Sequence, residues 1–377
     1  MTQPKRLQSV RVRNFKAIVD SKVVKLGALT AFIGNNGAGK SSLIEALETY
    51  RSIVRDGLDV AMQRWLGIEH ARHKGQEAKE QAGRPVNPIS FELAIGESSR
   101  KVQRVQLEAN NDPAANRIFI SKERITGVDR FIERNFKDIM QTYAPGRSVL
   151  SAPLVDYEEL STYIHNWQFL TLSPENMGLP VPQQRTGGSV RLARDGSNIA
   201  DFLRDLRQQD ISAYNGIEET MKYVLPYAVD LRPATTIELE RKAWLQMKEA
   251  NFEVPGWMLS TGTLRLLALL ALLRHPNPPS LIVIEEIENG LDPRSIHLLV
   301  EEIRNAVLDG TTQIILTTHS PYLLDLLTLE HLVLVERDAK GHPRFIRPSD
   351  NGNLQKWAQD FAPGKLYTMG NLSGSTL

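Results

Sequence analysis

The chain has 377 residues, of which 41% are hydrophobic and 24% charged, and its formal net charge is +1. These proportions are ordinary for a globular protein, and a charge so close to zero excludes a general affinity for polyanions. The sequence contains no cysteine, which excludes disulfide bonds and thiolate metal sites and suits a reducing compartment. The length allows either one large α/β domain with an insertion or two to three smaller domains.

No segment of the sequence predicts a membrane protein. The N-terminus has no apolar core of the kind that a signal peptide needs. The longest apolar run, Leu266–Leu273, is far shorter than the roughly 20 residues that span a bilayer. We therefore expect a cytoplasmic protein without a membrane segment.

Residues 1–25 carry seven Lys/Arg against one acid, and this segment is either a phosphate-binding edge or an ordinary solvated strand face.

The first half of the chain predicts a strand, a glycine loop and a helix, followed by a less regular region. Residues 7–15 alternate apolar and polar side chains, as a half-buried strand does. From residue 51 to about 88 the periodicity weakens and charge rises, which predicts an exposed, partly mobile insertion. Three antiparallel strands are expected next, at residues 89–95, 101–109 and 117–125. A mostly helical region is expected to follow at residues 129–232.

The second half alternates helices with short apolar strands, a pattern typical of a parallel sheet covered by helices. We expect a helix from about Gly262 to Arg274 and another from about Pro293 to Leu308. Buried strands are expected at Leu281–Ile284, at residues 312–318 and at residues 331–337.

The segment "GNNGAGKS", Gly34–Ser41, carries the clearest chemistry. It matches G-x-x-x-x-G-K-[ST] between an apolar strand and an amphipathic helix. Glycines let successive N–H groups face phosphate oxygens, and the helix N-terminus adds partial positive charge. A turn that merely joins strand to helix would not need the Lys–Ser pair that follows. The predicted nucleotide-binding residues are Asn35, Asn36, Gly37, Ala38, Gly39, Lys40, Ser41 and Ser42.

The strand Leu281–Ile284 ends in the adjacent carboxylates Glu285 and Glu286, with Glu288 two residues further on. Carboxylates at a strand end can hold a metal ion and orient a water molecule. We expect Glu285 and Ser41 to hold Mg²⁺ and Glu286 to act as the general base. Glu288 is expected to make a polar contact or cap. The common pair at such a position is Asp–Glu, so the Glu–Glu pair leaves the capacity to hydrolyse nucleotide open.

Three further motifs follow in a fixed order. "LSTGTLR" places Ser260 and Gly262 at the start of an apolar helix, "GLDP" follows the carboxylates, and His319 ends the next buried strand. Taken singly, Ser260 is a helix N-cap and His319 a core histidine. Together they resemble the signature motif, D-loop and switch histidine of the ABC-type ATPase superfamily, with "LIVIEE" as its Walker B strand.

The resemblance implies a P-loop NTPase of ABC-ATPase type: an α/β fold with a mixed central sheet, an antiparallel β lobe and a helical lobe. Residues 1–377 would form one ATPase domain. Within it, we expect an inserted β lobe and exposed segment at 51–130, a mainly helical lobe at 131–262, and the C-terminal half of the core at 263–377. The resemblance also implies a catalytic role for His319 with Glu286, and cofactors ATP and Mg²⁺.

In this superfamily the signature of one subunit completes the site of a second, so Ser260 and Gly262 would act in trans and Asp292 would lie at the dimer interface. "VRVRNFKAI" resembles the opening of SMC, RecF and OLD-type ATPases. "FLTLSPENM", "RDGSNIADFLRDLR" and "IEEIENGLDP" are similar to compact bacterial AAA-family or ABC-like ATPases found in phage defence beside a Toprim or HNH nuclease partner. The transporter branch fits less well, because Thr261 and Thr263 alter the signature and no adenine-stacking aromatic precedes the phosphate loop.

Two functions follow from these motifs and the resemblance. One is an ATP-hydrolysing homodimeric switch, slow in turnover, that controls a nuclease or toxin effector or acts on DNA in anti-phage defence. The alternative is a nucleotide-gated scaffold that holds a toxic partner inactive with little turnover. Gln168 is a weak candidate for the glutamine that joins the two lobes and is more typical of a polar residue at the edge of the core.

Overall fold

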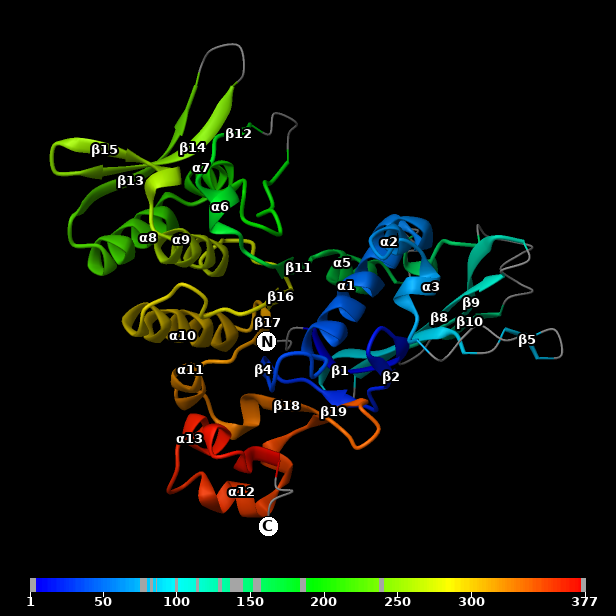
Figure 1. The fold of residues 1–377 in the computed structure, drawn as a ribbon. Helices are drawn as coiled ribbons and strands as arrows, with labels where there is room; N and C mark the ends of the chain where they lie inside the picture. The colour runs from blue at the N-terminus through cyan, green and yellow to red at the C-terminus, as the bar shows by residue number, and fades with distance from the viewer. Residues whose placement is uncertain are drawn as a thin grey trace. The chain divides into compact units, whose positions relative to one another are not determined.

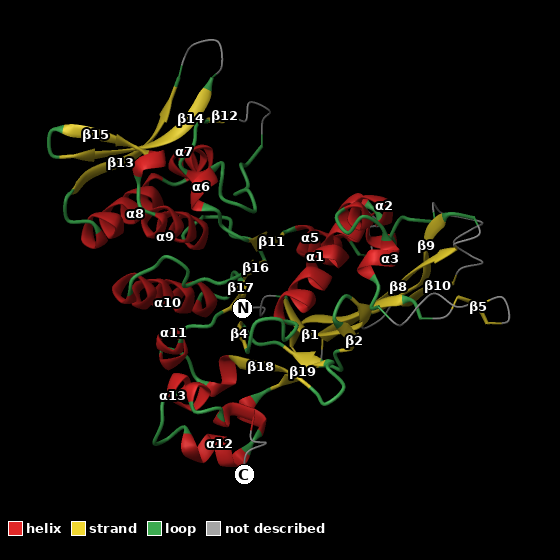
Figure 2. Cartoon of the chain, in the orientation of Figure 1, coloured by secondary structure: helices red, strands yellow, loops and turns green. Residues whose placement is uncertain are grey.

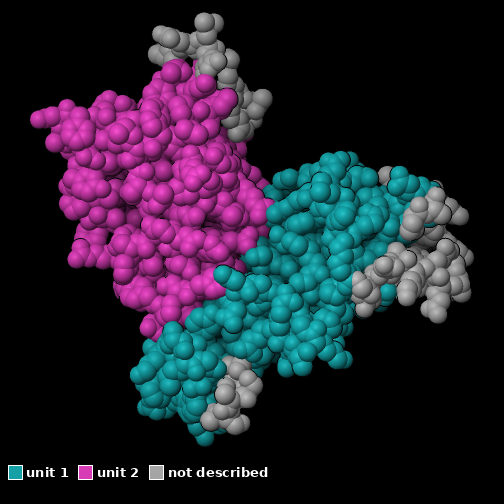
Figure 3. Space-filling model, in the orientation of Figure 1, with its two compact units in different colours: residues 1–167, 328–377 teal, residues 168–327 magenta. Residues whose placement is uncertain are grey.

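The computed structural model describes residues 5–74, 80–81, 84–85, 87–98, 101–112, 115–127, 131–135, 145–151, 157–183, 188–236 and 241–373. The chain divides into two compact units, residues 1–167 with 328–377 and residues 168–327 (Figure 3). Both units contain strands and helices (Figure 1, Figure 2). Among the described residues, none of the helices combines the length and apolar character needed to cross a membrane. We describe each unit by itself.

An antiparallel sheet dominates the first unit, and the three strands predicted for residues 89–125 are confirmed. β1 buries Leu7, Val10, Val12 and Phe15, and its register against β7 shifts between Leu7 and Ser9. The strand order is β10-β9-β8-β7-β1-β2, with β3 also paired to β1. The bounds are β1 Arg6–Phe15, β2 Ile18–Asp20, β3 Val24–Lys25, β7 Ile89–Ser98, β8 Lys101–Asp112, β9 Arg117–Thr126 and β10 Phe131–Asn135.

The prediction of an exposed insertion after residue 51 is wrong for residues 51–71, which form packed helices. α1 (Lys40–Asp56) is followed by α2 (Leu58–Gln63) and α3 (Ile68–Ala71). Leu58 and Met62 on α2 are buried, as are Ile68 and Ala71 on α3. Helices this short show too few turns for an apolar periodicity to stand out. The rest of the predicted insertion includes the short strands β5 (Glu80–Gln81) and β6 (Arg84–Pro85) and lies partly outside the described residues.

The first unit also holds the strand that precedes the phosphate loop. All five residues of β4 (Leu29–Ile33) are buried. β18 (Leu332–Arg337) pairs with β4 in parallel and with β19 (Pro343–Ile346) in antiparallel orientation, which makes this sheet mixed as expected. α12 (Gly352–Trp357) and α13 (Pro363–Thr368) follow in the C-terminal segment.

In the second unit, the predicted alternation of strand and helix is confirmed. β16 (Leu281–Ile284) and β17 (Gln313–Thr317) pair in parallel, and β11 (Trp167–Leu170) neighbours β16. Every residue of these three strands is buried. The associated helices are α9 Thr261–Leu273, α10 Pro293–Leu308 and α11 Pro321–Asp325.

The mainly helical prediction for residues 131–262 holds for several helices but is wrong for residues 228–255. There, β13 (Ala228–Thr235), β14 (Lys242–Glu249) and β15 (Phe252–Pro255) form an antiparallel sheet. α7 and α8 pack against this sheet (Figure 1). The signal was the alternation of buried Ala243, Leu245 and Met247, which the apolar Trp244 between them obscures. Other elements in this range are α5 Glu158–His165, α6 Pro174–Met177, β12 Val181–Pro182, α7 Ile199–Gln209 and α8 Ile211–Val224.

Candidate nucleotide site

The phosphate loop depends on three glycines in the left-handed region. Gly34, Gly37 and Gly39 have φ values of 139°, 74° and 117°. Residues with a side chain rarely adopt such angles, so glycine at these positions lets the backbone curl. The loop leads directly into α1, whose N-terminus can attract anions. The local geometry is therefore that of a phosphate cradle.

Lys40, the first residue of α1, is folded back onto this loop. Its ammonium donates to the carbonyl oxygens of Gly34 at 2.7 Å and Asn35 at 3.1 Å. Only 7% of Lys40 is exposed. The cation is thus held at the loop, and Ser41, the next residue, is exposed at the start of the helix.

Glu285 lies at the end of β16 beside two groups that sequence reasoning missed. Thr171 Oγ1 is 3.4 Å from a carboxylate oxygen of Glu285, and a guanidinium nitrogen of Arg194 is 3.8 Å from the same oxygen. Thr171 and Arg194 are themselves linked, because Thr171 N–H donates to the Arg194 carbonyl. The carboxylate is therefore anchored by a threonine and a cation from other loops of its own unit. Thr171 lies in the segment "FLTLSPENM" and Arg194 begins "RDGSNIADFLRDLR", but the sequence pointed to no role for either residue at the carboxylate.

Glu286 adopts a backbone conformation that is unusual for a glutamate. Its φ is 48°, in the left-handed region. Its N–H donates to Thr317 Oγ1 at 2.8 Å, and its carboxylate accepts a hydrogen bond from the Asn289 side chain. A non-glycine residue in this region costs of order 1–2 kcal/mol, and such strain clusters at functional sites. The left-handed backbone and these two contacts together set the direction of the exposed carboxylate.

Glu288 holds the loop that carries His319. One carboxylate oxygen accepts the backbone N–H groups of His319 at 2.6 Å and Ser320 at 3.1 Å. Ser320 in turn caps α11 by accepting from the N–H of Leu323. The sequence predicted only a polar contact or cap for Glu288. In the structure, Glu288 holds the backbone of the loop that positions His319. The single clue in the sequence was a third acid close behind a buried strand.

Ser260 and Gly262 begin α9. Ser260 Oγ accepts the N–H of Thr263 at 3.1 Å, so it is the N-cap of this helix. A Cβ atom on Gly262 would lie 2.3 Å from the carbonyl oxygen of Gly290, far inside contact distance. Glycine is required there because two backbone segments meet. The first turn of α9 and the loop after the carboxylates are thereby packed directly on each other.

Arg265, one turn into α9, also joins the helix to that loop. It donates to the carbonyl oxygens of Leu172 at 2.9 Å and Glu286 at 3.4 Å. Burial lowers the pKa of Arg265, although the nearby carboxylates of Glu286 and Glu288 oppose the shift. Arg265 is the last residue of the segment "LSTGTLR". Its contacts give it a structural role at the carboxylate loop.

Asp292 caps α10. Its side chain accepts the N–H groups of Arg294 at 2.9 Å and Ser295 at 3.2 Å and the Ser295 hydroxyl at 2.6 Å. The Ser295 hydroxyl, with the backbone N–H groups, lowers the pKa of Asp292 against the opposing effect of desolvation.

Gln168 is 6% exposed and donates to the Leu192 carbonyl at 2.6 Å, as a buried structural amide does.

The oxygen ligands suit a hard cation. Among the described residues, no group of three or more His, Cys, Asp or Glu side chains could hold a metal ion by itself. Mg²⁺ in nucleotide sites needs only one or two protein oxygens, because water and substrate phosphates complete its shell. Ser41 and Glu285 provide a hydroxyl and a carboxylate of this kind, one in each unit. Each of them is an oxygen ligand of the kind that Mg²⁺ accepts.

Comparison with known proteins gives matches over most of the chain. Residues 29–325 match the family described as "AAA domain, putative AbiEii toxin, Type IV TA system". An "ATP/GTP phosphatase" of Helicobacter pylori (strain ATCC 700392 / 26695) is 22% identical over 346 residues, covering 85% of this chain and 87% of that protein. "Nod factor export ATP-binding protein I" of Sinorhizobium fredii (strain NBRC 101917 / NGR234) is 37% identical over 173 residues, covering 45% of this chain and 46% of that protein. This chain therefore matches less than half the length of the latter protein.

The fold is also similar to solved structures. A structure described as "Crystal structure of the SmcHead bound to the C-winged helix domain of ScpA" matches with a TM-score of 0.57 and 14% identity, covering 90% of this chain and 97% of that chain. An identity this low carries the fold alone. The expected α/β P-loop ATPase fold of the SMC and ABC type is thus confirmed.

Proposed function

The chain belongs to the family described as "AAA domain, putative AbiEii toxin, Type IV TA system", and we propose that it is an ATP-hydrolysing switch that acts as a homodimer. The observation that best supports hydrolysis is the placement of the Glu286 carboxylate. Its strained backbone, its Thr317 contact and its Asn289 contact fix an exposed carboxylate directly after a buried strand. The names of the phosphatase and transporter relatives support nucleotide turnover in this fold.

In this proposal, the phosphate loop and Lys40 bind the β- and γ-phosphates of ATP. Ser41 and Glu285 would hold Mg²⁺, which would neutralise charge on the phosphate oxygens. Glu286 accepts a proton from the attacking water as the water oxygen bonds to the γ-phosphorus and the bond to ADP breaks. His319, positioned through Glu288, contacts the γ-phosphate.

The signature residues act in trans. Ser260 and Gly262 lie at the N-terminus of a 13-residue helix, where backbone N–H groups and the helix dipole stabilise negative charge. A second copy would bring this helix end to the γ-phosphate of the first, so ATP would join two copies and hydrolysis would release them. Asp292 would then lie at the dimer interface.

A separate effector completes the proposed role. The family description names a toxin of a toxin–antitoxin system, and the similar Smc head is bound to a domain of ScpA. Both support a function in which the ATPase cycle controls a partner protein, such as a Toprim or HNH nuclease in anti-phage defence. A nucleotide-gated scaffold with little turnover is the alternative, and it would require ATP occupancy alone.

Glu286→Gln tests the assignment. This substitution keeps the shape of the side chain and removes the base, so phosphate release should fall by about 10²–10⁴-fold. ATP binding should remain, and light scattering should show an ATP-dependent dimer that persists. Phosphate release equal to that of the wild type would rule out Glu286 as the base. A wild-type chain with no phosphate release, alone or with DNA, would favour the scaffold.

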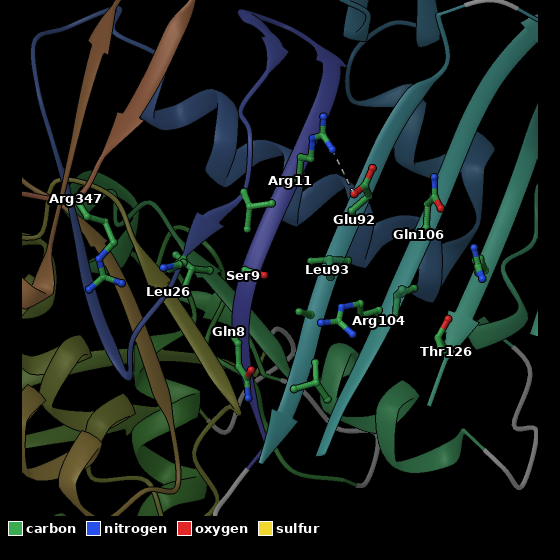
Figure 4. A pocket seen from close by; sticks show the side chains of 16 residues that line it. Gln8, Ser9, Arg11, Leu26, Glu92, Leu93, Arg104, Gln106, Thr126 and Arg347 are labelled. Carbon is green, nitrogen blue, oxygen red and sulfur yellow. Dashed lines mark ion pairs between the residues drawn. The ribbon is translucent and has the colours of Figure 1, made fainter. Parts of the chain in front are cut away.

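Nucleic acid is a second candidate ligand because of a basic groove on the antiparallel sheet of the first unit. A cavity of about 890 Å³ lies over β1, β7, β8 and β9 (Figure 4). Its lining contains five cationic side chains against one acid, Glu92; the cations are Arg11, Lys25, Arg104, Arg124 and Arg347.

The cations in this groove differ in whether they already take part in ion pairs. Arg11 is held by Asp20 at 2.9 Å, and Glu92 lies 3.9 Å away. Exposed Lys25 and Arg104 enter no ion pair within the described part of the chain, so they are available to phosphate oxygens. Fluorescence anisotropy with a labelled DNA duplex tests this site. The variant with Lys25→Ala and Arg104→Ala should bind more weakly and with a shallower salt dependence, whereas Lys248→Ala should not. Equal binding by both variants would exclude the groove.

A further inference from the structure

We propose that Arg337 is a positioning residue for the phosphate loop and sets nucleotide affinity from outside the region that matches the family. The inference rests on the proposed ATPase function, because it concerns the same loop. Arg337 ends β18 and lies beyond residue 325, where the family match stops. No sequence motif marks it.

The guanidinium of Arg337 binds the middle of the phosphate loop. Its Nε and one terminal nitrogen donate to the Gly37 carbonyl oxygen at 2.9 Å and 2.6 Å. The other terminal nitrogen donates to the Gly341 carbonyl at 2.6 Å. The cation therefore ties the loop to the β18–β19 hairpin, across a sequence separation of 300 residues.

The same C-terminal segment contacts the other two loop glycines. A Cβ on Gly34 would lie 2.1 Å from the Val335 carbonyl oxygen, and a Cβ on Gly39 would lie 2.6 Å from a ring carbon of Pro343. The Tyr367 side chain of α13 forms a hydrogen bond with the backbone of Gly34. Each glycine of the cradle thus meets a residue of the segment 335–367.

Gly37 depends on Arg337 more than the others do on their neighbours. A Cβ on Gly37 would meet no atom within 4 Å, so the backbone at this point has open space beside it. A cavity of about 810 Å³ lies next to the loop and is lined by Asn35, Asn36, Ala38 and Arg337, among others. Side-chain packing therefore does little to fix the peptide between Gly37 and Ala38. Its N–H donates to the Asn35 carbonyl oxygen at 3.1 Å, and its carbonyl oxygen is held by the two N–H···O bonds from Arg337.

The hairpin that presents Arg337 is itself ordered by a compact turn. The Asp338 carboxylate accepts the N–H groups of Lys340 and His342, each at 2.9 Å, and Asp338 N–H donates to the His342 carbonyl. Gly341 adopts a φ of 80° within this turn. An arginine on a fixed turn loses little further entropy when it binds the loop.

The direction of the Gly37 carbonyl matters for anion binding. A phosphate cradle works when N–H groups point inward and carbonyl oxygens point away from the anion. A peptide at a left-handed glycine can rotate easily and would then turn its carbonyl toward the phosphate. By holding that oxygen, Arg337 keeps the loop in its anion-binding form, and its positive charge adds a smaller attraction to the nucleotide.

Titration calorimetry with Mg·ATP and Mg·ADP on the full chain tests the proposal. Arg337→Ala should raise both Kd values by about 10- to 150-fold, the range expected for losing hydrogen bonds that involve a charged group. Arg337→Lys keeps the charge but not the planar pair of donors, so its Kd should lie close to that of the alanine variant. Arg344→Ala, an exposed cation on β19, is the matched control and should bind like the wild type.

Two further readouts separate positioning from simple loss of fold. Hydrogen exchange should rise in the peptide that contains residues 34–40 for both Arg337 variants and stay unchanged elsewhere. At saturating ATP, kcat should change less than about threefold, because the loop acts on binding more than on the base. Nucleotide affinity of Arg337→Ala equal to that of Arg344→Ala would overturn the proposal while leaving the ATPase assignment intact. A wild-type chain that binds no nucleotide would overturn both.

Discussion

Gly262→Ala provides a sharp test of the contact between the signature helix and the carboxylate loop. The added Cβ would lie 2.3 Å from the Gly290 carbonyl oxygen, whereas ordinary contact begins at 3.4 Å. One of the two segments must therefore move by about 1.1 Å (3.4 − 2.3). Neither side can give way by rotating a side chain, because both atoms belong to the backbone or are fixed to it. Gly290 also depends on being glycine, with a φ of 74°.

The magnitude follows from two opposing effects. Alanine inside a helix is normally favoured over glycine by about 0.5–1 kcal/mol. Overpacking against a rigid neighbour costs about 1–3 kcal/mol and should prevail here. A net loss of about 1 kcal/mol would lower Tm by about 2–4 °C for a unit of this size. A displacement of about 1 Å at a catalytic group costs on the order of 100-fold in rate, so turnover should suffer more than stability.

Phosphate release and thermal unfolding should be measured together, with Gly352→Ala as the control. Gly352 starts α12, and a Cβ there would meet nothing within 4 Å. We expect Gly352→Ala to match the wild type in both assays. Gly262→Ala should keep ATP binding at the phosphate loop but lose about 100-fold in kcat. Turnover of Gly262→Ala within threefold of the wild type would refute the steric reasoning.

Three further predictions concern the carboxylates. Glu288→Ala frees the loop of His319 and should lower kcat about 10-fold at an unchanged Kd for ATP; an equal loss in both would argue against a positioning role. Asp292→Ala removes the α10 cap and should cost about 1 kcal/mol in thermal unfolding at pH 7. Because the Ser295 hydroxyl lowers the pKa of Asp292 below the usual 3.8, this stabilisation should be present above that pH and decline as pH falls through the lowered pKa, so a difference from the wild type that grows as pH falls would contradict it. Both Glu286→Gly and Glu286→Ala lose the base, yet the glycine variant should be the more stable by about 1 kcal/mol in the free energy of unfolding and should therefore unfold at a higher temperature. The reason is that only glycine relieves the left-handed backbone; the opposite order would show that no strain resides there.

Sequence patterns predicted the elements that carry the site because those elements have local causes. The glycine loop before Lys40 and the apolar run before Glu285 are each written in a few consecutive residues. Helix and strand bounds in the second unit agree closely with the structure for the same reason: α10 begins at Pro293, and β16 spans Leu281–Ile284 as expected. The sheet at residues 228–255 was missed because its alternation is weak without the strands that it pairs with.

Tertiary structure decided the features that depend on contacts between distant segments. The left-handed Glu286 is held by Thr317, the loop of His319 by Glu288, and Gly37 by Arg337. Such hydrogen bonds join residues that are 31 or even 300 positions apart, and no local periodicity encodes them. The sequence alone therefore determined which chemical groups the protein has for handling a nucleotide. Folding decided which neighbours fix those groups in place, because only the packed chain brings the neighbours together.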